Sequence, residues 1–391
     1  MRAPRLLLVT TVPGTLRHFL LPYAEHMRER GWEVDALTGE EEGGVPEEVT
    51  KAFDQVQTMP WRRDVKAVTN WTTAPRRVRQ LLVRERYDVL HTHTPVASLV
   101  SRLAVASLPK RSRPAVCYTA HGFHFHPLGR PSANRLFRGA ERVAGHWTDR
   151  LLVLNEHDLA VARDRRFVPD GHAVLMPGVG IDLDHYRPTA ELLREAEQVR
   201  ADLGVAPGRA LFTVLAELRA GKGHLSVVRA LAADPGLDAV LACAGRGPQR
   251  DAVLQEAARL GVEDRVRLLG SVADVRPLVL ASTATVLMSR REGLSRAVLE
   301  SLALGVPVLG SRIRGIADVV DRPDAGVLVE PDDVEGLTAA MRAAVSYPGP
   351  EQLRVRLEPL LRRYELGSVL DRHAALYEEL AARRTPVAPG G

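Results

Sequence analysis

The chain has 391 residues, of which 45% are hydrophobic and 26% charged; these are globular proportions, and the length suits two domains. Its only two cysteines, Cys117 and Cys243, exclude a disulfide framework and a cysteine-rich zinc site, and they favour a reducing cytoplasm. The net charge of +5 is spread along the chain without a DNA-binding or RNA-binding motif, so we expect no nucleic-acid partner.

Short apolar runs typical of buried strands alternate with helical runs along the whole chain. The N-terminus begins with such a run and lacks a signal-peptide core, and no stretch reaches the ~18 apolar residues of a membrane span. The expected strands are 6–10, 33–37, 89–91, 115–119, 150–154, 173–176, 211–216, 239–244, 266–269, 285–288, 306–309 and 327–329. This alternation predicts an α/β fold with parallel sheets and helices on both of their faces.

The strand–helix rhythm restarts after residue 208, which predicts two doubly wound domains. We place the hinge at 177–188 (PGVGIDLDHYRP), with a first domain over 1–180 and a second over 181–365. A C-terminal helix is expected at 366–384, and the tail at 385–391 has the composition of a disordered segment. Ligands of doubly wound sheets bind outside the carboxyl ends of the strands, so two such edges facing one another would form a ligand cleft.

A cation-rich segment at 76–86 (RRVRQLLVRER) has the pattern of an amphipathic helix. One interpretation is a solvated helix face. The other is peripheral contact with an anionic membrane, which would place the protein on the inner face of that membrane.

Two carboxylates eight residues apart, Glu292 and Glu300, mark the most informative segment, 289–320. Glu292 lies in a glycine-containing turn, and Ser295 is the expected N-cap of a helix over 296–304 that Gly305 ends. Free N–H groups at a helix start suit a phosphate. At ~1.5 Å rise per residue the two carboxylates would stand roughly 10–12 Å apart, a spacing that matches the hydroxyls at the two ends of a nucleotide diphosphate sugar. The alternative is two solvated glutamates on a surface helix.

The sequence EGL at 292–294, followed by Glu300 and by ALGVPV at 303–308, resembles the signature of the retaining, nucleotide-sugar-dependent glycosyltransferases of family four, which have the GT-B fold. The resemblance spans nearly the whole chain, through PGVGID at 177–182, CAGRGP at 243–248, LLG at 268–270 and GVLVEPD at 326–332. The sequence YTAHGFH at 118–124 is similar to a bacterial polysaccharide-assembly branch. The resemblance implies two Rossmann-like domains facing across a cleft, with the C-terminal helix crossing back to the first domain.

Lys222 is the only lysine after Lys110 in a chain whose other cations are almost all arginines. It lies in a GKG loop at an expected helix start, where a compact ammonium group suits a diphosphate and is hard to replace by arginine. The resemblance implies that this lysine contacts the donor diphosphate. Most family members have an arginine where this chain has Glu217, so Arg219 is the cation that could complete the site. The expected donor-binding residues are Gly14, Arg219, Lys222, Gly245, Gly247, Leu269, Glu292, Gly293, Leu294, Ser295 and Glu300.

Three histidines, His121, His124 and His126, follow the expected strand 115–119. A zinc site is one interpretation, but Gly122 and the lack of a nearby cysteine or glutamate argue against it; a structural loop histidine is another. The resemblance implies that His121 lies beside the donor sugar and phosphate and helps to position the reacting groups. We therefore expect His121, Glu292 and Lys222 to be catalytic, and His93 and His124 to lie on the acceptor side, although His93 could equally be a plain loop residue.

The resemblance implies transfer of a hexose or N-acetylhexosamine, with retention, from a nucleotide sugar, and the nucleotide that we expect is UDP. The acceptor would be a hydroxyl of a lipid-linked glycan or a small natural product. Protein cations and helix amides would neutralise the leaving diphosphate, so we expect neither a cofactor nor a metal. The alternatives are a non-hydrolysing UDP-sugar 2-epimerase, which shares the scaffold, and a catalytically inactive nucleotide-sugar-binding partner protein.

Overall fold

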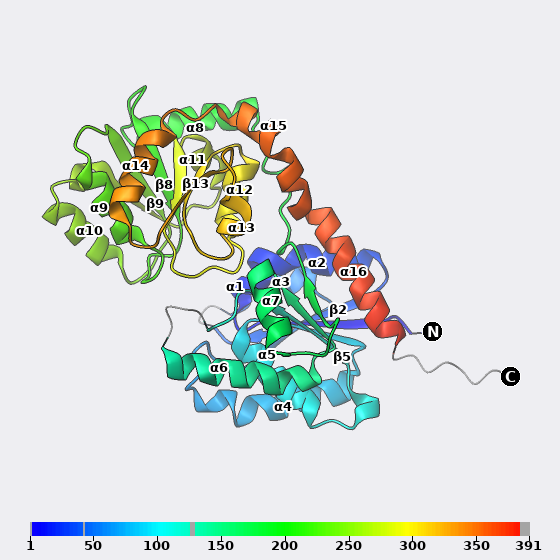
Figure 1. Cartoon of the computed structure of the whole chain (residues 1–391). Helices are drawn as coiled ribbons and strands as arrows, with labels where there is room; N and C mark the ends of the chain where they lie inside the picture. Colours follow the sequence, from blue (N-terminus) through cyan, green and yellow to red (C-terminus); the bar gives the residue numbers. More distant parts are fainter. Residues whose placement is uncertain (1, 42–43, 126–129, 384–391) are drawn as a thin grey trace. The chain divides into compact units, whose positions relative to one another are not determined.

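The computed structural model describes residues 2–41, 44–125 and 130–383, and these form two compact units (Figure 1). Unit 1 combines Met1–Gly180 with the segment from Gly367 onward, and unit 2 comprises Ile181–Leu366. His126 and the C-terminal tail at 385–391 lie outside the described residues. Within the described ranges, no helix is long and apolar enough to cross a membrane.

Seven parallel strands form the sheet of unit 1, in the order β3-β2-β1-β4-β5-β6-β7. The strand order reverses at β1, which pairs with both β2 and β4. Doubly wound sheets bind ligands outside the carboxyl ends of the strands at such a reversal. The strands are β1 (Arg5–Val9), β2 (Glu33–Gly39), β3 (Gln55–Met59), β4 (Val89–His93), β5 (Ala115–Ala120), β6 (Arg150–Val153) and β7 (Ala173–Leu175).

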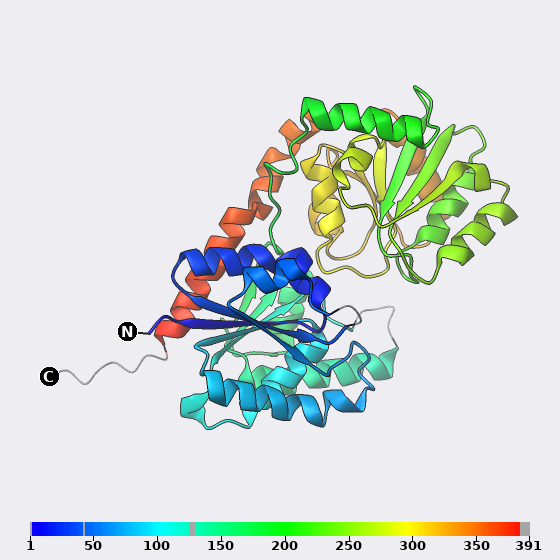
Figure 2. The ribbon, with the colours of Figure 1, turned by 180° about the vertical axis from the view of Figure 1, so that it is seen from behind.

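Helices cover both faces of this sheet, as Figure 1 and, from behind, Figure 2 show. Because side chains alternate along a strand, Leu7 and Leu90 form a core with α4 and α5, whereas His91 contacts α16 on the opposite face. The helices are α1 (Pro13–Thr15), the π-helix η1 (Leu16–Leu20), α2 (Leu21–Glu29), α3 (Glu47–Ala52), the 3₁₀ helix η2 (Val68–Asn70), α4 (Thr73–Glu85), α5 (Pro95–Ala106), α6 (Pro131–Ala144), α7 (Glu156–Asp164) and α16 (Leu366–Ala382), with further 3₁₀ turns at Lys110–Ser112 and Gly145–Trp147.

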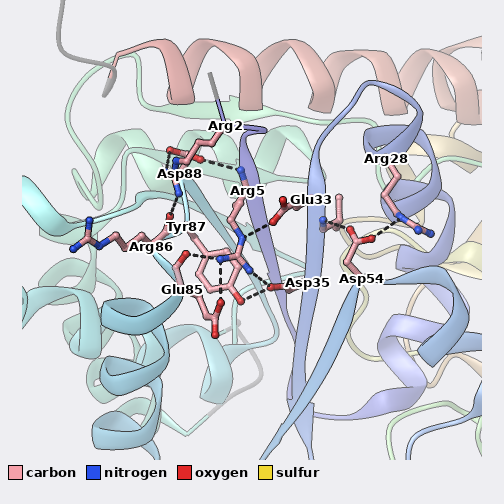
Figure 3. A network of polar contacts seen from close by, with 11 residues as sticks. Arg2, Arg5, Arg28, Glu33, Asp35, Asp54, Glu85, Arg86, Tyr87 and Asp88 are labelled. Carbon is pink, nitrogen blue, oxygen red and sulfur yellow. Dashed lines mark hydrogen bonds and ion pairs between the residues drawn. The ribbon is translucent and has the colours of Figure 1, made fainter.

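A charged network joins the amino-terminal ends of the unit 1 strands (Figure 3). Arg5, the first residue of β1, forms ion pairs of 3.0 Å with Asp35 and with Glu85, and Tyr87 donates a 2.6 Å hydrogen bond to Asp35. Burial raises the pKa of the Asp35 carboxyl, although Tyr87 and Arg5 oppose that shift. The network links β1 and β2 to the segment before β4. The carboxyl ends of these strands, where doubly wound sheets bind ligands, lie on the opposite side.

Six parallel strands form the sheet of unit 2, in the order β10-β9-β8-β11-β12-β13, and here the order reverses at β8. The strands are β8 (Ala210–Leu215), β9 (Ala239–Ala244), β10 (Val266–Gly270), β11 (Ala284–Leu287), β12 (Val308–Ser311) and β13 (Gly326–Val329). The helices are α8 (Ala190–Asp202), α9 (His224–Ala233), α10 (Arg250–Arg259), α11 (Arg276–Leu280), α12 (Arg296–Ala303), α13 (Ala317–Val320), α14 (Val334–Ala344) and α15 (Pro350–Leu361), with 3₁₀ turns at Glu263–Arg265 and Arg362–Tyr364.

The two parallel sheets confirm the predicted doubly wound α/β fold, and each strand expected from the sequence is present. The strand β3 was not predicted, because QVQTM is a partly exposed edge strand without an apolar run. The helical pattern that the sequence shows toward its C-terminus is not continuous. It is interrupted at Arg362–Tyr364 and at Glu365, whose backbone is extended.

Candidate functional site

The GKG loop of unit 2 connects β8 to α9 and is held closely against the end of β11. Gly221 accepts a 2.8 Å hydrogen bond from the Arg290 amide. Gly223 has a φ of +80°, and a Cβ there would lie 2.2 Å from the Met288 carbonyl oxygen. The backbone can therefore adopt this path only with glycine at position 223. The loop places Lys222 beside the β11 end, at the strand-order reversal of the sheet.

Lys222 and Glu292, both predicted as catalytic, are in direct contact. Lys222 Nζ lies 2.6 Å from Glu292 Oε1, and the two side chains are 17% and 13% exposed. Two residues 70 positions apart in the chain are thus brought together at one sheet edge. A mostly enclosed ammonium group of this kind is suited to exchange its carboxylate partner for a phosphate oxygen.

Further cations surround this pair. Burial lowers the pKa of Arg291, and the nearby charges of Arg219 and Arg314 lower it further. Arg219 is half-exposed and forms a 3.0 Å ion pair with Glu217. The sequence analysis did not select Arg291 or Arg314, although the run of arginines before Glu292 was a signal that could have found them. Positive charge concentrated in this way suits a diphosphate.

Glu300 is fixed by two side chains that the sequence analysis also missed. Its Oε1 accepts hydrogen bonds from the Tyr186 hydroxyl at 2.7 Å and from Arg296 Nε at 2.8 Å. Burial, and then the Glu300 charge, raise the pKa of Tyr186, so the phenol stays protonated and remains a donor. The carboxylate is 13% exposed and has one oxygen outside these two bonds.

The turn at 293–295 leads into α12 as expected, and Gly305 ends the helix with a φ of +74°. Ser295 is the N-cap residue by its backbone but makes no side-chain capping bond. A Cβ on Gly315 would lie 2.1 Å from the Gly293 carbonyl oxygen, so the loop after β12 packs directly on the turn. Leu294 packs on the hydrophobic core of unit 2.

Gly245 and Gly247 follow β9, and close backbone contacts explain both. A Cβ on Gly245 would lie 2.0 Å from the Ala216 carbonyl oxygen, and one on Gly247 would lie 2.3 Å from that of Leu218. The two glycines let the loop after β9 lie against the loop that carries Arg219. Leu269, in β10, packs partly buried against the unit 2 core. These three residues shape the site edge, and whether they touch a ligand stays a prediction.

In unit 1, His121 follows β5 and contacts His93 at the end of β4. His93 Nδ1 lies 3.0 Å from His121 Nε2. Burial lowers the pKa of His121 to about 4 and lowers that of His93 well below its ordinary value, so both rings are neutral at neutral pH. His93 is 1% exposed and belongs to the strand itself, so the alternative of a plain loop residue is wrong, and its place on the acceptor side stays a prediction. It contacts His121, which is partly exposed.

The remaining predicted residues of unit 1 are more peripheral. His124 is half-buried, and its ring centroid lies 5.5 Å from that of Phe137. Gly14 lies inside the first helical turn, α1, where a Cβ would meet only His18 at 4.0 Å. Position 14 therefore has room for a side chain, and no steric contact requires glycine there. The described residues contain no group of three or more histidine, cysteine, aspartate or glutamate side chains arranged to hold a metal.

Comparisons with known proteins identify the class of both units. Residues 19–185 match the family described as Glycosyltransferase Family 4, and residues 212–346 match Glycosyl transferases group 1. The putative glycosyltransferase EpsD of Bacillus subtilis is 29% identical over 357 residues, which are 90% of this chain and 89% of EpsD. An Escherichia coli UDP-Gal:alpha-D-GlcNAc-diphosphoundecaprenol alpha-1,3-galactosyltransferase is 27% identical over 270 residues, 67% of each chain.

Solved structures show the same fold at low sequence identity. The Anabaena protein Alr3699/HepE in complex with UDP superposes with a TM-score of 0.76 at 18% identity, over 96% of this chain and 100% of that one. Sucrose-phosphate synthase from Thermosynechococcus elongatus gives a TM-score of 0.80 at 19% identity, over 97% of this chain and 100% of the other.

Proposed function

Since this chain belongs to the GT-B glycosyltransferases of family four, we propose that it transfers a hexose or N-acetylhexosamine from a UDP-linked sugar to a hydroxyl acceptor, with retention of the anomeric configuration. The observation that carries this proposal is the contact of Lys222 with Glu292 among the cations of the β8–β11 edge. HepE was solved with UDP-glucose, and the Escherichia coli relative is named for a UDP-galactose donor; both support a UDP-sugar here.

The cations of unit 2 would act on the leaving group. When the bond between the sugar and the diphosphate breaks, negative charge grows on the departing phosphate oxygen. Lys222, once its ion pair with Glu292 is exchanged for the phosphate, and Arg291, with the amides at 293–295, would stabilise that charge. The acceptor hydroxyl would attack from the face that the diphosphate leaves, through an oxocarbenium-like state, and its proton would pass to the departing phosphate oxygen. Because the protein itself supplies this positive charge, we expect full turnover in EDTA.

Glu300 would bind the nucleotide. Its carboxylate is held by Tyr186 and Arg296, which leaves one oxygen to accept from ribose hydroxyls. Glu292 would leave its ion pair with Lys222 and accept from the hydroxyls of the transferred sugar. In unit 1, His121 would position the reacting groups.

Unit 1 has a surface of exposed apolar side chains, which would suit a lipid-linked acceptor. Six of the eight large hydrophobic side chains that are exposed in the described residues lie between residues 65 and 143, on η2, α4, α6 and their flanks. They include Leu136 and Val143 of α6, which are 70% and 53% exposed. The helices α4 and α6 flank α5 on one face of the sheet (Figure 1). Two curated relatives are named for diphosphopolyprenol-linked acceptors, which reside in membranes.

The charge of this surface is complementary to anionic lipid. The same helices α4 and α6 carry exposed arginines, whereas Glu85 is paired with Arg5 and Arg84, and Glu141 with Arg102. Helices that combine apolar side chains with arginine bind the interface of anionic bilayers. We therefore expect peripheral binding to vesicles that contain phosphatidylglycerol. Leu136→Asp should release the protein from them, and Val355→Asp, an equally exposed position in unit 2, should not.

A donor screen followed by product analysis tests the activity. Purified protein is incubated with a panel of nucleotide sugars, with and without a polyprenyl-diphosphate glycan, while nucleotide release and thermal stabilisation are measured. We expect UDP release that depends on the acceptor, and a product whose anomeric coupling in NMR equals that of the donor. An inverted product would contradict retention. Release of no nucleotide from any donor, together with no thermal stabilisation by UDP, would overturn the proposed function.

A further inference from the structure

The sheet of unit 1 contains a cluster of histidines that the proposed transfer does not by itself require. His91, His93 and His373 are each at most 2% exposed. Burial lowers the pKa of all three, so each ring is neutral and carries a single N–H. In a neutral histidine one nitrogen donates and the other accepts, so hydrogen bonds decide which nitrogen holds the proton. His93 is hydrogen-bonded to His121, so the nitrogen of His93 that holds its proton determines which ring nitrogen of His121 is protonated.

His93 has little freedom to move. Its ring centroid lies 4.0 Å from that of His91, which is bound on both sides: His91 Nδ1 lies 2.5 Å from the Tyr377 hydroxyl of α16, and Nε2 lies 2.8 Å from Thr119 Oγ1. The backbone after His93 is also fixed. Thr94 has a φ of +65°, a conformation rare for a β-branched residue, and its hydroxyl donates to the His93 carbonyl oxygen.

The two nitrogens of His93 have different surroundings. Nδ1 faces His121 Nε2 at 3.0 Å, whereas Nε2 is buried without a hydrogen-bond partner among the described residues. A proton on Nε2 would be a buried N–H with no acceptor, which is rarer and more costly than a buried acceptor with no donor. The proton of His93 is thus expected on Nδ1, from which it is donated to His121 Nε2.

We propose that His93 is a positioning residue that, through this hydrogen bond, holds His121 with its proton on Nδ1, so that His121 presents an N–H donor to an oxygen of the nucleotide sugar. His121 Nε2 is occupied as an acceptor, which leaves the proton on Nδ1, and the residue is partly exposed. His121 would act as a neutral donor and not as a base. The ligand assignment rests on the proposed function, whereas the proton position does not.

The proton position is measured directly in the full-length, ligand-free protein. Histidines are labelled with ¹⁵N, and a long-range ¹H–¹⁵N spectrum at neutral pH distinguishes protonated from unprotonated ring nitrogens. The spectrum of His121→Asn identifies the His121 signals among the 13 histidines. We expect a protonated Nδ1 and an unprotonated Nε2. A protonated Nε2 on His121 would overturn the proposal, and this measurement does not depend on the folding of a His93 variant.

Kinetic variants then test positioning. His93→Leu removes the hydrogen bond and should lower kcat about tenfold, while the Kd for UDP changes less than about twofold. His93→Asn keeps a donor near the position of Nδ1 and should recover part of the lost kcat. The control is His172→Leu, since His172 is a partly buried histidine of the same sheet but lies just before β7, at the opposite end of the strands. An unchanged kcat in a folded His93→Leu protein would refute the positioning role.

The two hypotheses fail differently. If the wild-type protein transfers sugar but its His121 is protonated on Nε2, only the inference about His93 is wrong. If no nucleotide sugar reacts but His121 carries its proton on Nδ1, the proposed function is wrong and the proton position stands.

Discussion

In the ligand-free chain Lys222 forms an ion pair with a carboxylate, and we expect its removal to lower turnover. Its ammonium group lies 2.6 Å from Glu292 in a loop fixed by backbone contacts. Lys222→Ala should lower kcat/KM by about 10²-fold or more, comparable to the loss of an oxyanion donor. Lys222→Arg should recover only part, because a planar guanidinium places its charge elsewhere. Steady-state rates with the best UDP-sugar measure both effects.

The controls for Lys222 come from the same chain. Lys51→Ala removes an exposed lysine of unit 1, whose partner is Glu47, and should leave turnover unchanged. Arg219→Ala should have a milder effect than Lys222→Ala, because Arg219 is half-exposed and already bound by Glu217. If the loss of activity were large in Arg219→Ala and small in Lys222→Ala, Arg219 and not Lys222 would hold the diphosphate. Thermal melts of each variant separate loss of function from unfolding.

Glu300 should contribute to nucleotide binding directly. Glu300→Ala removes a charge-assisted acceptor worth roughly 1.5–3 kcal/mol, so the affinity for UDP should fall about tenfold or more. Tyr186→Phe leaves the carboxylate in place but removes the 2.7 Å bond that orients it, and it should cost only about twofold to fivefold. Calorimetry with UDP measures both. An unchanged affinity in Glu300→Ala would place the ribose elsewhere.

At the scale of elements, two glycines of the β8–α9 loop offer a matched test of loop packing. Gly221 and Gly223 both have positive φ, at +89° and +80°. Around Gly221 a Cβ would find open space, whereas at Gly223 it would lie 2.2 Å from the backbone of Met288. Gly221→Ala should cost about 1–2 kcal/mol of unfolding free energy and Gly223→Ala about 3 kcal/mol or more. Equal losses in chemical denaturation would mean that the loop is not held against β11.

The contact between α9 and α10 gives unit 2 a defined pH dependence. Glu256 binds Arg259 and Arg229, and these hydrogen bonds lower the pKa of its carboxyl to about 2. A carboxyl with a lowered folded-state pKa stabilises above the unfolded value of about 4.3, and that contribution is lost as the pH falls toward 2.

Glu256→Gln should therefore lower the Tm by about 1 °C at pH 7, and the difference should shrink between about pH 5 and pH 3. Glu197→Gln, on the exposed side of α8, is the control and should show no such trend. A Tm difference that stayed constant with pH would show that the pairing with the two arginines is not its source.

The elements were more predictable from the sequence than the contacts between them. The helix after Glu292 and its glycine end were predicted nearly to the residue, because N-caps and glycine ends are local signals. The partner Tyr186 was not, because only the folded chain brings it beside Glu300, 114 positions away. Arg291 and His91 are close in sequence to Glu292 and His93 and could have been selected from the sequence. An apolar pattern also cannot show where a strand that ends in polar residues stops, which is why the strand predicted at 89–91 continues to His93.

At the scale of the whole molecule, unit 1 is built from both ends of the chain. The C-terminal helix α16 supplies Tyr377, which is fully buried, contacts His91 and lies near Trp32. It also supplies Glu379, whose carboxylate pairs with Arg150 at 2.7 Å. Unit 2, in contrast, is one continuous segment with its own hydrophobic core on each face of its sheet. The two units should therefore differ in their ability to fold alone.

We expect the segment 181–366 to fold when expressed by itself, because it contains every strand and core residue of unit 2. The segment 1–180 should not, because without α16 it exposes the apolar surface around Tyr23 and Trp32 and the buried His91. Cooperative melting and amide dispersion in NMR measure folding of each. Adding a peptide of residues 364–384 should restore structure to 1–180, and the same peptide with Tyr377→Ala should not, since loss of a buried aromatic side chain costs about 3–5 kcal/mol. A segment 1–180 that melts cooperatively without the peptide would show that α16 is dispensable for the fold of unit 1.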